Sequence, residues 1–204
     1  MHHEFLKRTL VFRDQILQAT AFIHEDPKGY ELWQTPKRRC CVPAKSRYMF
    51  PFNLAAQECK ICGTGEFGPQ SGDIALDCSA NMGVTDHEEL LAGTAKVVAF
   101  EPAPENVERL RRAFAEEIAL GRVIIIPKGV WDKDDFLMLR VDPINSAANT
   151  FILNVEGKVG AGKVPVTTID KVVLDLGLER VDYIKFDVEG AELFALEGAR
   201  ETIT

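Results

Sequence analysis

Short apolar runs alternate with helical patterns through the second half of the chain. Residues 74–76 and 97–100 are compact apolar runs, and each is followed by a single carboxylate, Asp77 and Glu101. The segment between them contains small residues and a helical pattern. Two buried strands joined by a helix form a βαβ unit, so the pattern predicts a parallel sheet. Ligands of such sheets bind beyond the carboxyl ends of the strands, where we expect both carboxylates to point into one acidic crevice.

Further apolar runs after this unit predict more strands and helices. Residues 123–126 are all apolar and predict a buried third strand, after which Gly129 falls where an adenine edge would lie by analogy with the first two strands. Residues 181–186 predict another strand, which ends in Asp187 and Glu189, and a helix to about residue 203. These two acids are expected on the same sheet edge as Asp77 and Glu101, where four acids suit a cationic cofactor or a divalent ion.

Two helices are predicted on either side of the second strand. In the first, Thr85 and Glu88 have the spacing of a capping box, residues 90 and 91 supply a buried face, and Gly93 ends the helix. This helix places Asn81 and Gly83 in the turn under its N-terminus, where N–H groups could meet a ligand carboxylate. His87 is interpreted as a surface residue.

The second helix begins at the prolines 102 and 104. An apolar stripe predicts its buried face, and three arginines a solvated face. The stripe is Val107, Leu110, Phe114 and Ile118, and the arginines are Arg109, Arg111 and Arg112.

A change of pattern after residue 135 predicts a hairpin near the mouth of the crevice. Its strands would be residues 136–141 and 150–153, joined by the polar turn 142–149. Residues 157–162 are glycine-rich and are expected to form a flexible loop. A short helix then follows Asp170 and stops at Gly177.

The N-terminal third has a different character. Apolar residues recur at helical spacing over residues 5–23, which predicts an amphipathic helix that either covers one face of the sheet or forms a contact between two copies. Residues 26–48 are rich in proline, glycine and basic residues, which indicates an irregular lid or linker. We therefore divide the chain into an N-terminal extension, residues 1–70, and a ligand-binding domain, residues 71–204.

Composition narrows the class of protein. The chain has 204 residues, 46% of them hydrophobic, which suits a globular core. A net charge of −7 argues against a general nucleic-acid or anionic-membrane binder. No segment approaches the roughly 20 apolar residues of a membrane span, and no secretory signal precedes the odd number of cysteines, so a reduced, cytoplasmic setting is expected.

Four of the five cysteines lie close together in the sequence. Cys40 and Cys41 are adjacent, and Cys59 and Cys62 form a C-x-x-C pair. Four thiols could hold zinc, and a C-x-x-C pair could act as a redox couple. Adjacent cysteines supply two ligands awkwardly, and no nearby histidine supports a metal site, so ordinary thiols are the preferred interpretation and no metal is predicted.

The acids of the βαβ unit discriminate between cofactors. A dinucleotide pyrophosphate would be repelled by Asp77, and residues 79–83, Ser-Ala-Asn-Met-Gly, lack the closely spaced glycines of a dinucleotide fingerprint. S-adenosylmethionine carries an ammonium and a sulfonium, which a carboxylate attracts. Glu101 could also accept two ribose hydroxyl hydrogen bonds. The alternative is that both acids only cap loops or helix starts.

Four motifs resemble the FkbM family of S-adenosylmethionine-dependent methyltransferases from about residue 72 to the end of the chain. Residues 77–83, Asp-Cys-Ser-Ala-Asn-Met-Gly, are similar to the family's Asp-x-Gly-Ala-Asn-x-Gly. The others, in the family's order, are residues 98–106, 164–170 and 182–192. The resemblance implies an α/β fold with a doubly wound, Rossmann-like class I methyltransferase sheet, and transfer of a methyl group to a hydroxyl, often on a sugar or a natural product.

The resemblance also suggests roles for individual residues. Asp77, Ser79, Asn81 and Gly83 would hold the methionine end of S-adenosylmethionine. Glu101, with Pro102 and Gly129 nearby, would hold its ribose and adenine, while Asp187 and Glu189 would face the reacting centre. Asp187 could take the proton of a small-molecule hydroxyl acceptor.

Two features depart from the family pattern. Ser79 stands where the family usually has glycine, and the last strands of the family's sheet are missing from the sequence. The second departure keeps open a non-catalytic cofactor-binding module or a sheet completed by a partner. A nucleotide-dependent oxidoreductase is a further alternative, but Asp77 and the missing glycines argue against it.

Overall fold

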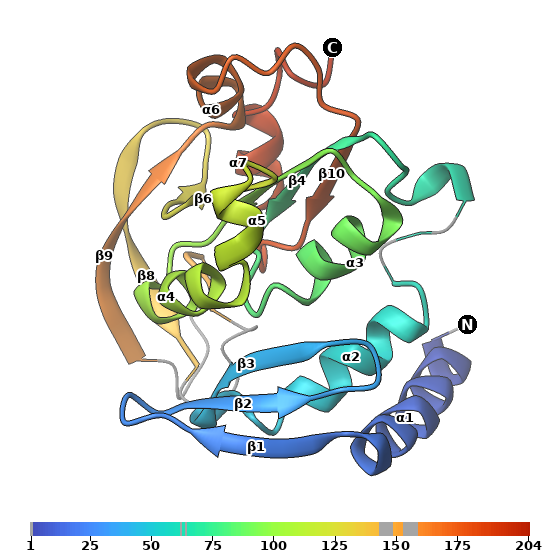
Figure 1. The fold of residues 1–204 in the computed structure, drawn as a ribbon. Coiled ribbons are helices and arrows are strands. Elements are labelled where there is room, and N and C mark those ends of the chain that lie inside the picture. Colours follow the sequence, from blue (N-terminus) through green and yellow to red (C-terminus); the bar gives the residue numbers. More distant parts are fainter. Residues whose placement is uncertain (1, 62, 64, 143–148, 153–158) are drawn as a thin grey trace.

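The computed structural model of the chain describes residues 2–61, 63, 65–142, 149–152 and 159–204. Figure 1 shows a layer of two helices and a small sheet under a larger body built around parallel strands. The lower layer, here called the N-terminal layer, consists of α1 (His2–Ala19), β1 (Ala21–Glu25), β2 (Tyr30–Gln34), β3 (Arg39–Pro43) and α2 (Phe50–Glu58), with a 3-10 turn at Ala44–Ser46. A second 3-10 turn, η2 (Gly65–Phe67), leads into the larger body.

The larger body contains the remaining elements in chain order. They are β4 (Ile74–Cys78), α3 (Val84–Ala92), β5 (Lys96–Phe100), α4 (Pro104–Ala113), α5 (Ala115–Ala119), β6 (Val123–Ile126), β7 (Gly129–Val130), β8 (Asp135–Val141), β9 (Val159–Thr167), α6 (Ile169–Asp175), β10 (Tyr183–Phe186) and α7 (Glu192–Glu197). None of the helices in the described part of the chain is long and apolar enough to cross a membrane.

A four-stranded parallel sheet forms the centre of the larger body. The strand order is β10-β4-β5-β6, and all neighbouring pairs are parallel. The predicted βαβ unit is confirmed as β4, α3 and β5, and the predicted strands at residues 123–126 and 181–186 are β6 and β10. Val97, Val98 and Leu76 are fully buried because helices cover both faces of these strands.

Alternate residues of the strands face two separate hydrophobic cores. Leu76, Val98 and Phe100 pack with residues of α6 and α7 on one face. Val97 and Ala99 pack with residues of α4, and with Leu90 of α3, on the other. The sheet is therefore doubly wound, as the sequence predicts, and its carboxyl edge carries the loops that follow β4, β5 and β10.

A small second sheet of the larger body differs from the predicted hairpin. Its order is β7-β9-β8, and β8 pairs in antiparallel fashion with β9 rather than with residues 150–153. Thr150 forms only an isolated bridge to Arg140. Gly160 and Gly162, predicted to lie in a loop, instead contribute to β9, where the register of the β8–β9 pair shifts between Leu139 and Arg140 and one extra residue forms a bulge. Residues 143–148 of the predicted turn, residue 153 of the predicted second strand and residues 157 and 158 of the predicted loop lie outside the described residues.

The N-terminal layer corrects the prediction of an irregular lid. The predicted helix ends at Ala19, and Phe22 belongs to β1 of an antiparallel sheet ordered β1-β2-β3. The turn residues that suggested an irregular segment connect these strands. In the first turn, the Asp26 carboxylate accepts hydrogen bonds from the backbone N–H groups of Lys28 and Tyr30 at 2.8 and 3.0 Å. Proline and glycine therefore mark the turns of a meander here.

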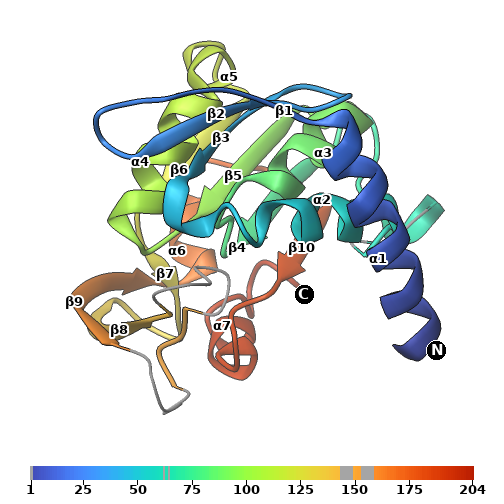
Figure 2. The same ribbon diagram turned by 90° about the horizontal axis from the view of Figure 1, so that it is seen from below.

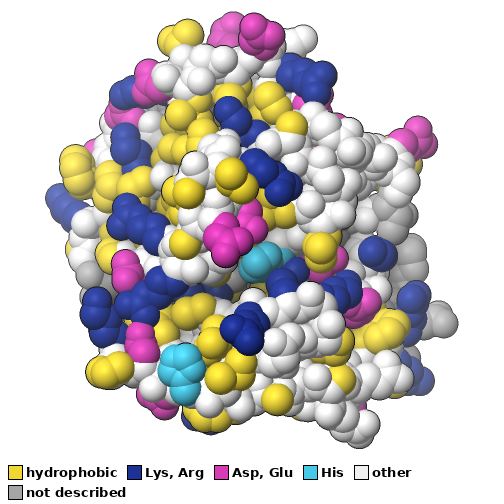
Figure 3. Space-filling view, viewed as in Figure 1, with side chains coloured by type: hydrophobic (Ala, Val, Ile, Leu, Met, Phe, Trp, Pro, Cys, Tyr) yellow, Lys and Arg dark blue, Asp and Glu magenta, His cyan; other side chains and the backbone are white. Residues whose placement is uncertain are grey.

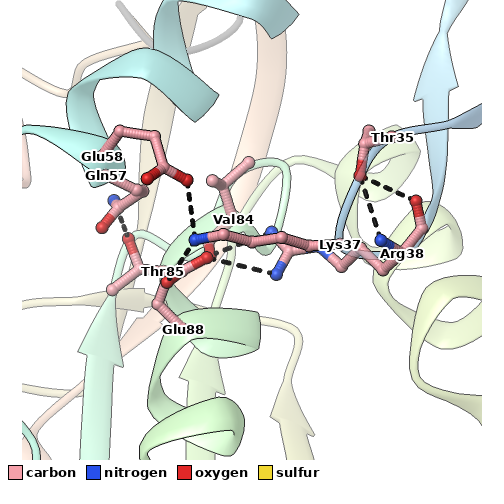
Figure 4. A network of polar contacts seen from close by, with 8 residues as sticks. All are labelled: Thr35, Lys37, Arg38, Gln57, Glu58, Val84, Thr85 and Glu88. Atoms are coloured by element: carbon pink, nitrogen blue, oxygen red, sulfur yellow. Dashed lines mark hydrogen bonds and ion pairs between the residues drawn. The ribbon is translucent and has the colours of Figure 1, made fainter. Parts of the chain in front are cut away.

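Charged residues join the N-terminal layer to α3 and α4. Figure 3 shows basic side chains along the boundary between the two parts on the face seen in Figure 1. Lys37 is paired with Glu58 of α2 and Glu88 of α3, at 2.7 and 3.5 Å, and Arg38 also reaches Glu88 (Figure 4). Arg112 of α4 pairs with Asp26. The layer is thus fixed against the helices that flank the parallel sheet.

Candidate active site

The loop after β4 lies at the carboxyl edge of the sheet and has unusual backbone geometry. Ser79 and Asn81 have φ angles of 81° and 45°, in the left-handed region that favours glycine. The N–H groups of Ser79 and Ala80 both donate to the carbonyl oxygen of Phe100 at 3.0 and 2.9 Å. A left-handed Ser79 explains why glycine is the usual residue at this position of the motif, and its strain is of the kind found at binding sites.

Gly83 ends the loop and begins α3. Its φ is 64°, and a Cβ at this position would lie 2.6 Å from the Phe114 ring and 2.8 Å from Leu110. Gly83 itself is the N-cap of α3, and no side chain caps the helix, so the predicted Thr85 capping box is wrong. The Thr85 hydroxyl instead accepts a hydrogen bond from Gln57 of α2 at 3.2 Å. Leu91, predicted to be buried, is 62% exposed.

Glu101 is buried directly behind this loop. Its two carboxylate oxygens accept the backbone N–H groups of Asn81 and Ala103, each at 2.8 Å, and the residue is 3% exposed. Burial raises the pKa of the Glu101 carboxyl, while the two N–H donors act in the opposite direction. Since an ionised carboxylate has about four lone-pair sites, each oxygen retains capacity for a further donor.

Two cavities open on either side of the loop. The smaller has a volume of about 20 Å³, and Glu101, Pro102 and Gly129 line it together with Ser79. Phe151 narrows this cavity, because its ring lies 2.6 Å from the position of a Cβ on Gly129. The structure therefore brings together four of the predicted site residues in one enclosed space.

The larger cavity has a volume of about 620 Å³ and lies between the larger body and the N-terminal layer. Its lining comes from the loop after β4, from β10 and from α2, which lies across the ends of β4 and β10 when the molecule is seen from below (Figure 2). Ser79 lines both cavities, so the two meet at this residue. Of the two cavities, Asn81 lines the larger and not the smaller.

Asp77 does not lie at the edge of the crevice as expected. Its side chain is fully buried beneath the loop and forms an ion pair with Lys185, which faces it across the β4–β10 pair at 3.0 Å. Burial raises the pKa of the Asp77 carboxyl, and Lys185 partly opposes this. The Lys185 ammonium also lies 3.4 Å from the Ser79 carbonyl oxygen and lines the larger cavity. Asp77 therefore influences the cavity through Lys185.

Two further acids lie buried near Asp77, on α3. Asp86 and Glu89 are fully buried, and none of their carboxylate oxygens has a hydrogen-bond partner among the described residues. Burial, and next the charge of Asp77, raises the pKa of Asp86 well above its usual value and that of Glu89 to about 10. The Glu89 carboxyl is therefore protonated at neutral pH. The sequence signal for them is their spacing of three residues, which places both acids on one face of α3.

The two acids after β10 are separated by the structure. Asp187 lines the larger cavity, and its side chain is 66% exposed at 3.8 Å from the Lys185 ammonium. Glu189 does not line either cavity, and its φ is 51°. Its carbonyl oxygen accepts a hydrogen bond from the Thr150 hydroxyl at 2.7 Å. The expected rim of four acids is thus reduced to Asp187 in the larger cavity and Glu101 in the smaller.

Arg109, predicted to be solvated, is buried and supports the loop. It is 2% exposed, and its guanidinium donates to the carbonyl oxygens of Asn81 at 2.8 Å and Cys41 at 2.9 Å. Burial lowers the pKa of Arg109 to about 10. Asn81 is therefore held at both ends of its backbone, by Glu101 at the N–H and by Arg109 at the carbonyl oxygen. The sequence signal is weak: Arg109 lies three residues after the buried Asn106.

The cysteines and His87 are parts of the packing. Cys40 is buried in a core cluster with Val42 and Phe50, and Cys59 contacts the Thr9 hydroxyl at 3.6 Å, while Cys62 lies outside the described residues. Within the described ranges, no group of three or more His, Cys, Asp or Glu side chains could hold a metal ion. The His87 ring packs 4.3 Å from the Phe114 ring, and burial lowers its pKa to about 3, so His87 is not the surface residue we expected.

The larger body resembles known methyltransferases in sequence. Residues 77–204 match the family model of the methyltransferase FkbM domain. Methyltransferase sdnD of Sordaria araneosa is 30% identical over an alignment of 160 residues, and the match covers 64% of this chain and 62% of the relative. Hexuronic acid methyltransferase AglP of Haloferax volcanii is 28% identical over 129 residues, 63% of this chain and 51% of the relative. The chain thus spans less than two-thirds of the length of either relative.

A solved structure with a related arrangement is the methyltransferase FkbM from Methylobacillus flagellatus KT. It is 16% identical in sequence, with a TM-score of 0.47, and the match covers 96% of this chain and 45% of the other.

Proposed function

Because the chain belongs to the family of FkbM methyltransferase domains, we propose that it binds S-adenosylmethionine at the carboxyl edge of its parallel sheet and transfers the methyl group to a hydroxyl of a small molecule. The acceptor would be a sugar or a natural-product-like compound, in keeping with the name of the hexuronic acid methyltransferase among its relatives. The observation that carries the proposal is the meeting of two cavities at Ser79, one with a buried carboxylate and one large enough for an acceptor.

The smaller cavity fits the adenosine end of the cofactor chemically. Glu101 is a buried acceptor with lone pairs left after its two N–H bonds, and a ribose offers two hydroxyl donors. Gly129 lies on the wall of this cavity, and its lack of a side chain leaves room for a flat ring. A Cβ on residue 129 would meet Phe151. At about 20 Å³ the cavity has room for little more than one water molecule, so Phe151 has to move aside for a ribose and an adenine to bind.

The larger cavity fits the methionine end and the acceptor. Asn81 and Ser79 form its wall next to the smaller cavity, and Asp187 lies across from them. A volume of about 620 Å³ is within the usual range of roughly 300–1,000 Å³ for small-molecule sites. When bound, S-adenosylmethionine supplies a methyl group attached to a positively charged sulfur, which a nucleophilic oxygen can displace.

The residues of the chain contribute mainly by positioning. Glu101 and Arg109 fix Asn81, and Lys185 ties the loop to β10 through the Ser79 carbonyl oxygen. Placing two reactants in the right geometry supplies much of the rate enhancement in displacement reactions. Asp187, exposed in the larger cavity, is our candidate to accept the proton of the hydroxyl. Glu189 lines neither cavity and is the weaker of the two predicted catalytic acids.

Calorimetric titration with S-adenosylhomocysteine tests the cofactor site. We expect the wild-type chain to bind, and Glu101→Ala and the milder Glu101→Gln to bind at least about tenfold more weakly, because hydrogen bonds to a charged acceptor contribute roughly 1.5–3 kcal/mol each. Glu116→Ala changes an exposed glutamate of α5 and should bind like the wild type. Equal affinities of wild type and folded Glu101→Ala would refute the ribose assignment.

A further inference from the structure

The wall that α2 and η2 contribute to the larger cavity has no assigned role. It carries Asn53 and Gln57 of α2 and Phe67 of η2, all from the N-terminal extension that lies outside the matched family domain. We infer that this wall is the acceptor-binding surface, and that it selects a neutral, polyhydroxylated ring such as a hexose unit over a charged one. The inference rests on the proposed function, because it takes the opposite wall of the cavity to be the cofactor's side.

The polar groups of the wall suit hydroxyl groups. Asn53 is half-buried, and its side chain forms no hydrogen bond within the described part of the chain. An amide offers two donors and one acceptor oxygen, and a hydroxyl can both donate and accept, so one amide can bind two neighbouring hydroxyls of a ring. Gln57 is held in place by its hydrogen bond to Thr85 and lies one helical turn further along the same face.

The apolar part of the wall suits the face of a saturated ring. Phe67 lines the cavity, and the residue is 79% exposed, so most of its ring surface is open to a ligand. An exposed aromatic ring is a flat apolar surface, against which the C–H groups of a sugar ring pack while its hydroxyls remain at the edge. Amides and an aromatic ring on one wall therefore match a ligand with hydroxyls around its rim and C–H groups on its face.

The charges of the cavity argue against an acidic acceptor. Lys185 and Asp187 are the charged residues among the described lining residues, and their charges cancel. The Lys185 ammonium is already bound to the buried Asp77 at 3.0 Å and lies 3.8 Å from Asp187. A carboxylate on the acceptor would compete with Asp77 for this cation and would meet the negative charge of Asp187. A neutral ring avoids both costs.

The wall is held in a fixed position relative to the loop after β4. Figure 4 shows Lys37 between Glu58 of α2 and Glu88 of α3, and Gln57 against Thr85 of α3. These contacts join α2 to the helix that begins directly after the loop. A ligand bound to α2 is therefore placed at a defined distance from Ser79 and Asn81, which is what a transfer reaction requires.

Saturation-transfer NMR with two sets of probes tests the inference. The probes are methyl hexopyranosides and the corresponding methyl hexuronides, each titrated into the full 204-residue chain with and without S-adenosylhomocysteine. We expect at least one neutral hexopyranoside to bind at least tenfold more tightly than its uronide. Asn53→Ala and Phe67→Ala should each weaken this binding at least fivefold and leave the affinity for S-adenosylhomocysteine unchanged.

Two variants control for indirect effects. Gln18→Ala removes an exposed amide from α1, and Phe136→Ala removes an exposed aromatic ring from β8, and neither residue lines the cavity. Both should bind the saccharide like the wild type. Tighter binding of the uronides, absence of binding by every neutral probe, or neutral binding unaffected by both wall variants would overturn the inference. If saccharide binding depends on Asn53 but the chain does not bind S-adenosylhomocysteine, the proposed function is refuted. The assignment of this wall as a saccharide-binding surface is then supported.

Discussion

The ammonium of Lys185 lies 3.0 Å from the carboxylate of Asp77, at the position directly across the β4–β10 pair. Asp77 is fully buried, whereas the Lys185 side chain is 15% exposed and lines the larger cavity. The pair therefore joins the core beneath the sheet edge to the site above it. Lys185 also lowers the pKa values of two other buried acids, Asp86 and Glu89.

Lys185→Met should strongly destabilise the chain. The substitution keeps the apolar stem and leaves the Asp77 carboxylate buried without its cation, which typically costs about 3–5 kcal/mol of unfolding free energy. Urea unfolding monitored by circular dichroism measures the loss. Lys171→Met removes an exposed pair with Asp134 and should leave the stability nearly unchanged. The double variant Asp77→Asn with Lys185→Met should lose less than the sum of the single variants, and strict additivity would contradict the pairing.

Glu89→Gln should change how stability depends on pH. The folded chain holds a proton on Glu89 up to a pKa of about 10, while an unfolded glutamate releases it near 4.5. Folding above pH 4.5 therefore takes up a proton, and stability falls as the pH rises through this window, by up to about 1.4 kcal/mol per pH unit for one group.

Urea midpoints measured between pH 5 and 9 test this slope. Glu89→Gln cannot ionise, so its midpoint should fall less steeply than that of the wild type, and the variant should become the more stable form at high pH. Glu116→Gln, at an exposed position on α5, should follow the wild-type curve. Parallel curves for Glu89→Gln and wild type would show that Glu89 does not hold its proton in the folded chain.

Arg109→Lys should loosen the loop after β4. Arginine reaches two carbonyl oxygens at once, those of Asn81 and Cys41, and a single ammonium on a flexible stem cannot reproduce this fork. We expect the unfolding free energy to fall by about 2 kcal/mol, and the affinity for S-adenosylhomocysteine to fall as well, because Asn81 loses its support. Arg111→Lys on the exposed side of the same helix is the matched control and should change neither quantity.

The parallel sheet could be predicted from the sequence because its strands are buried on both faces. Residues 97–100 and 123–126 are unbroken apolar runs, which few other structures explain. The first and second strands were therefore placed correctly together with the helix between them. The ends of that helix were less predictable, since the left-handed Gly83 replaced the expected side-chain cap.

The N-terminal strands were not predicted because their surroundings differ. All five residues of β1 are exposed, so the strand has no alternation of apolar and polar residues that would mark it in the sequence. Its apolar residues instead fit the helical spacing of the preceding segment. In β2 and β3 the apolar residues are interspersed with Glu31 and Cys41. The turns next to these strands contain the proline and glycine that suggested an irregular lid or linker. Tertiary contacts to α4, through Arg109 and Arg112, help to make these strands part of the site.

The candidate site residues that follow strand ends were predicted from the sequence, and those that act through tertiary contacts were missed. Glu101 and Asp187 follow strands and line the cavities, as their positions indicated. Lys185 and Arg109 act through tertiary contacts to Asp77 and Asn81, which no spacing in the sequence reveals. The position of α2 over the sheet edge is likewise a tertiary property, so the wall with Asn53 could not be predicted either.

A matched pair of glycine substitutions isolates the packing at the start of α3. Gly83 and Gly29 have similar backbone angles, with φ of 64° and 77°, so alanine should impose a left-handed strain of about 1–2 kcal/mol at each. Nothing lies within 4 Å of a Cβ at Gly29, whereas one at Gly83 would approach Phe114 at 2.6 Å and Leu110 at 2.8 Å. Gly83→Ala should therefore lose about 1–3 kcal/mol more than Gly29→Ala, from overpacking.

Guanidinium unfolding of both variants measures the difference directly, because the effect of alanine on the unfolded chain is similar in the two and cancels in the comparison. Since Gly83 follows the loop that carries Asn81, Gly83→Ala should also weaken S-adenosylhomocysteine binding, while Gly29→Ala should not. Equal losses of stability would mean that Phe114 gives way without cost, and the close fit between this helix start and α4 would then play no part in holding the loop in its strained conformation.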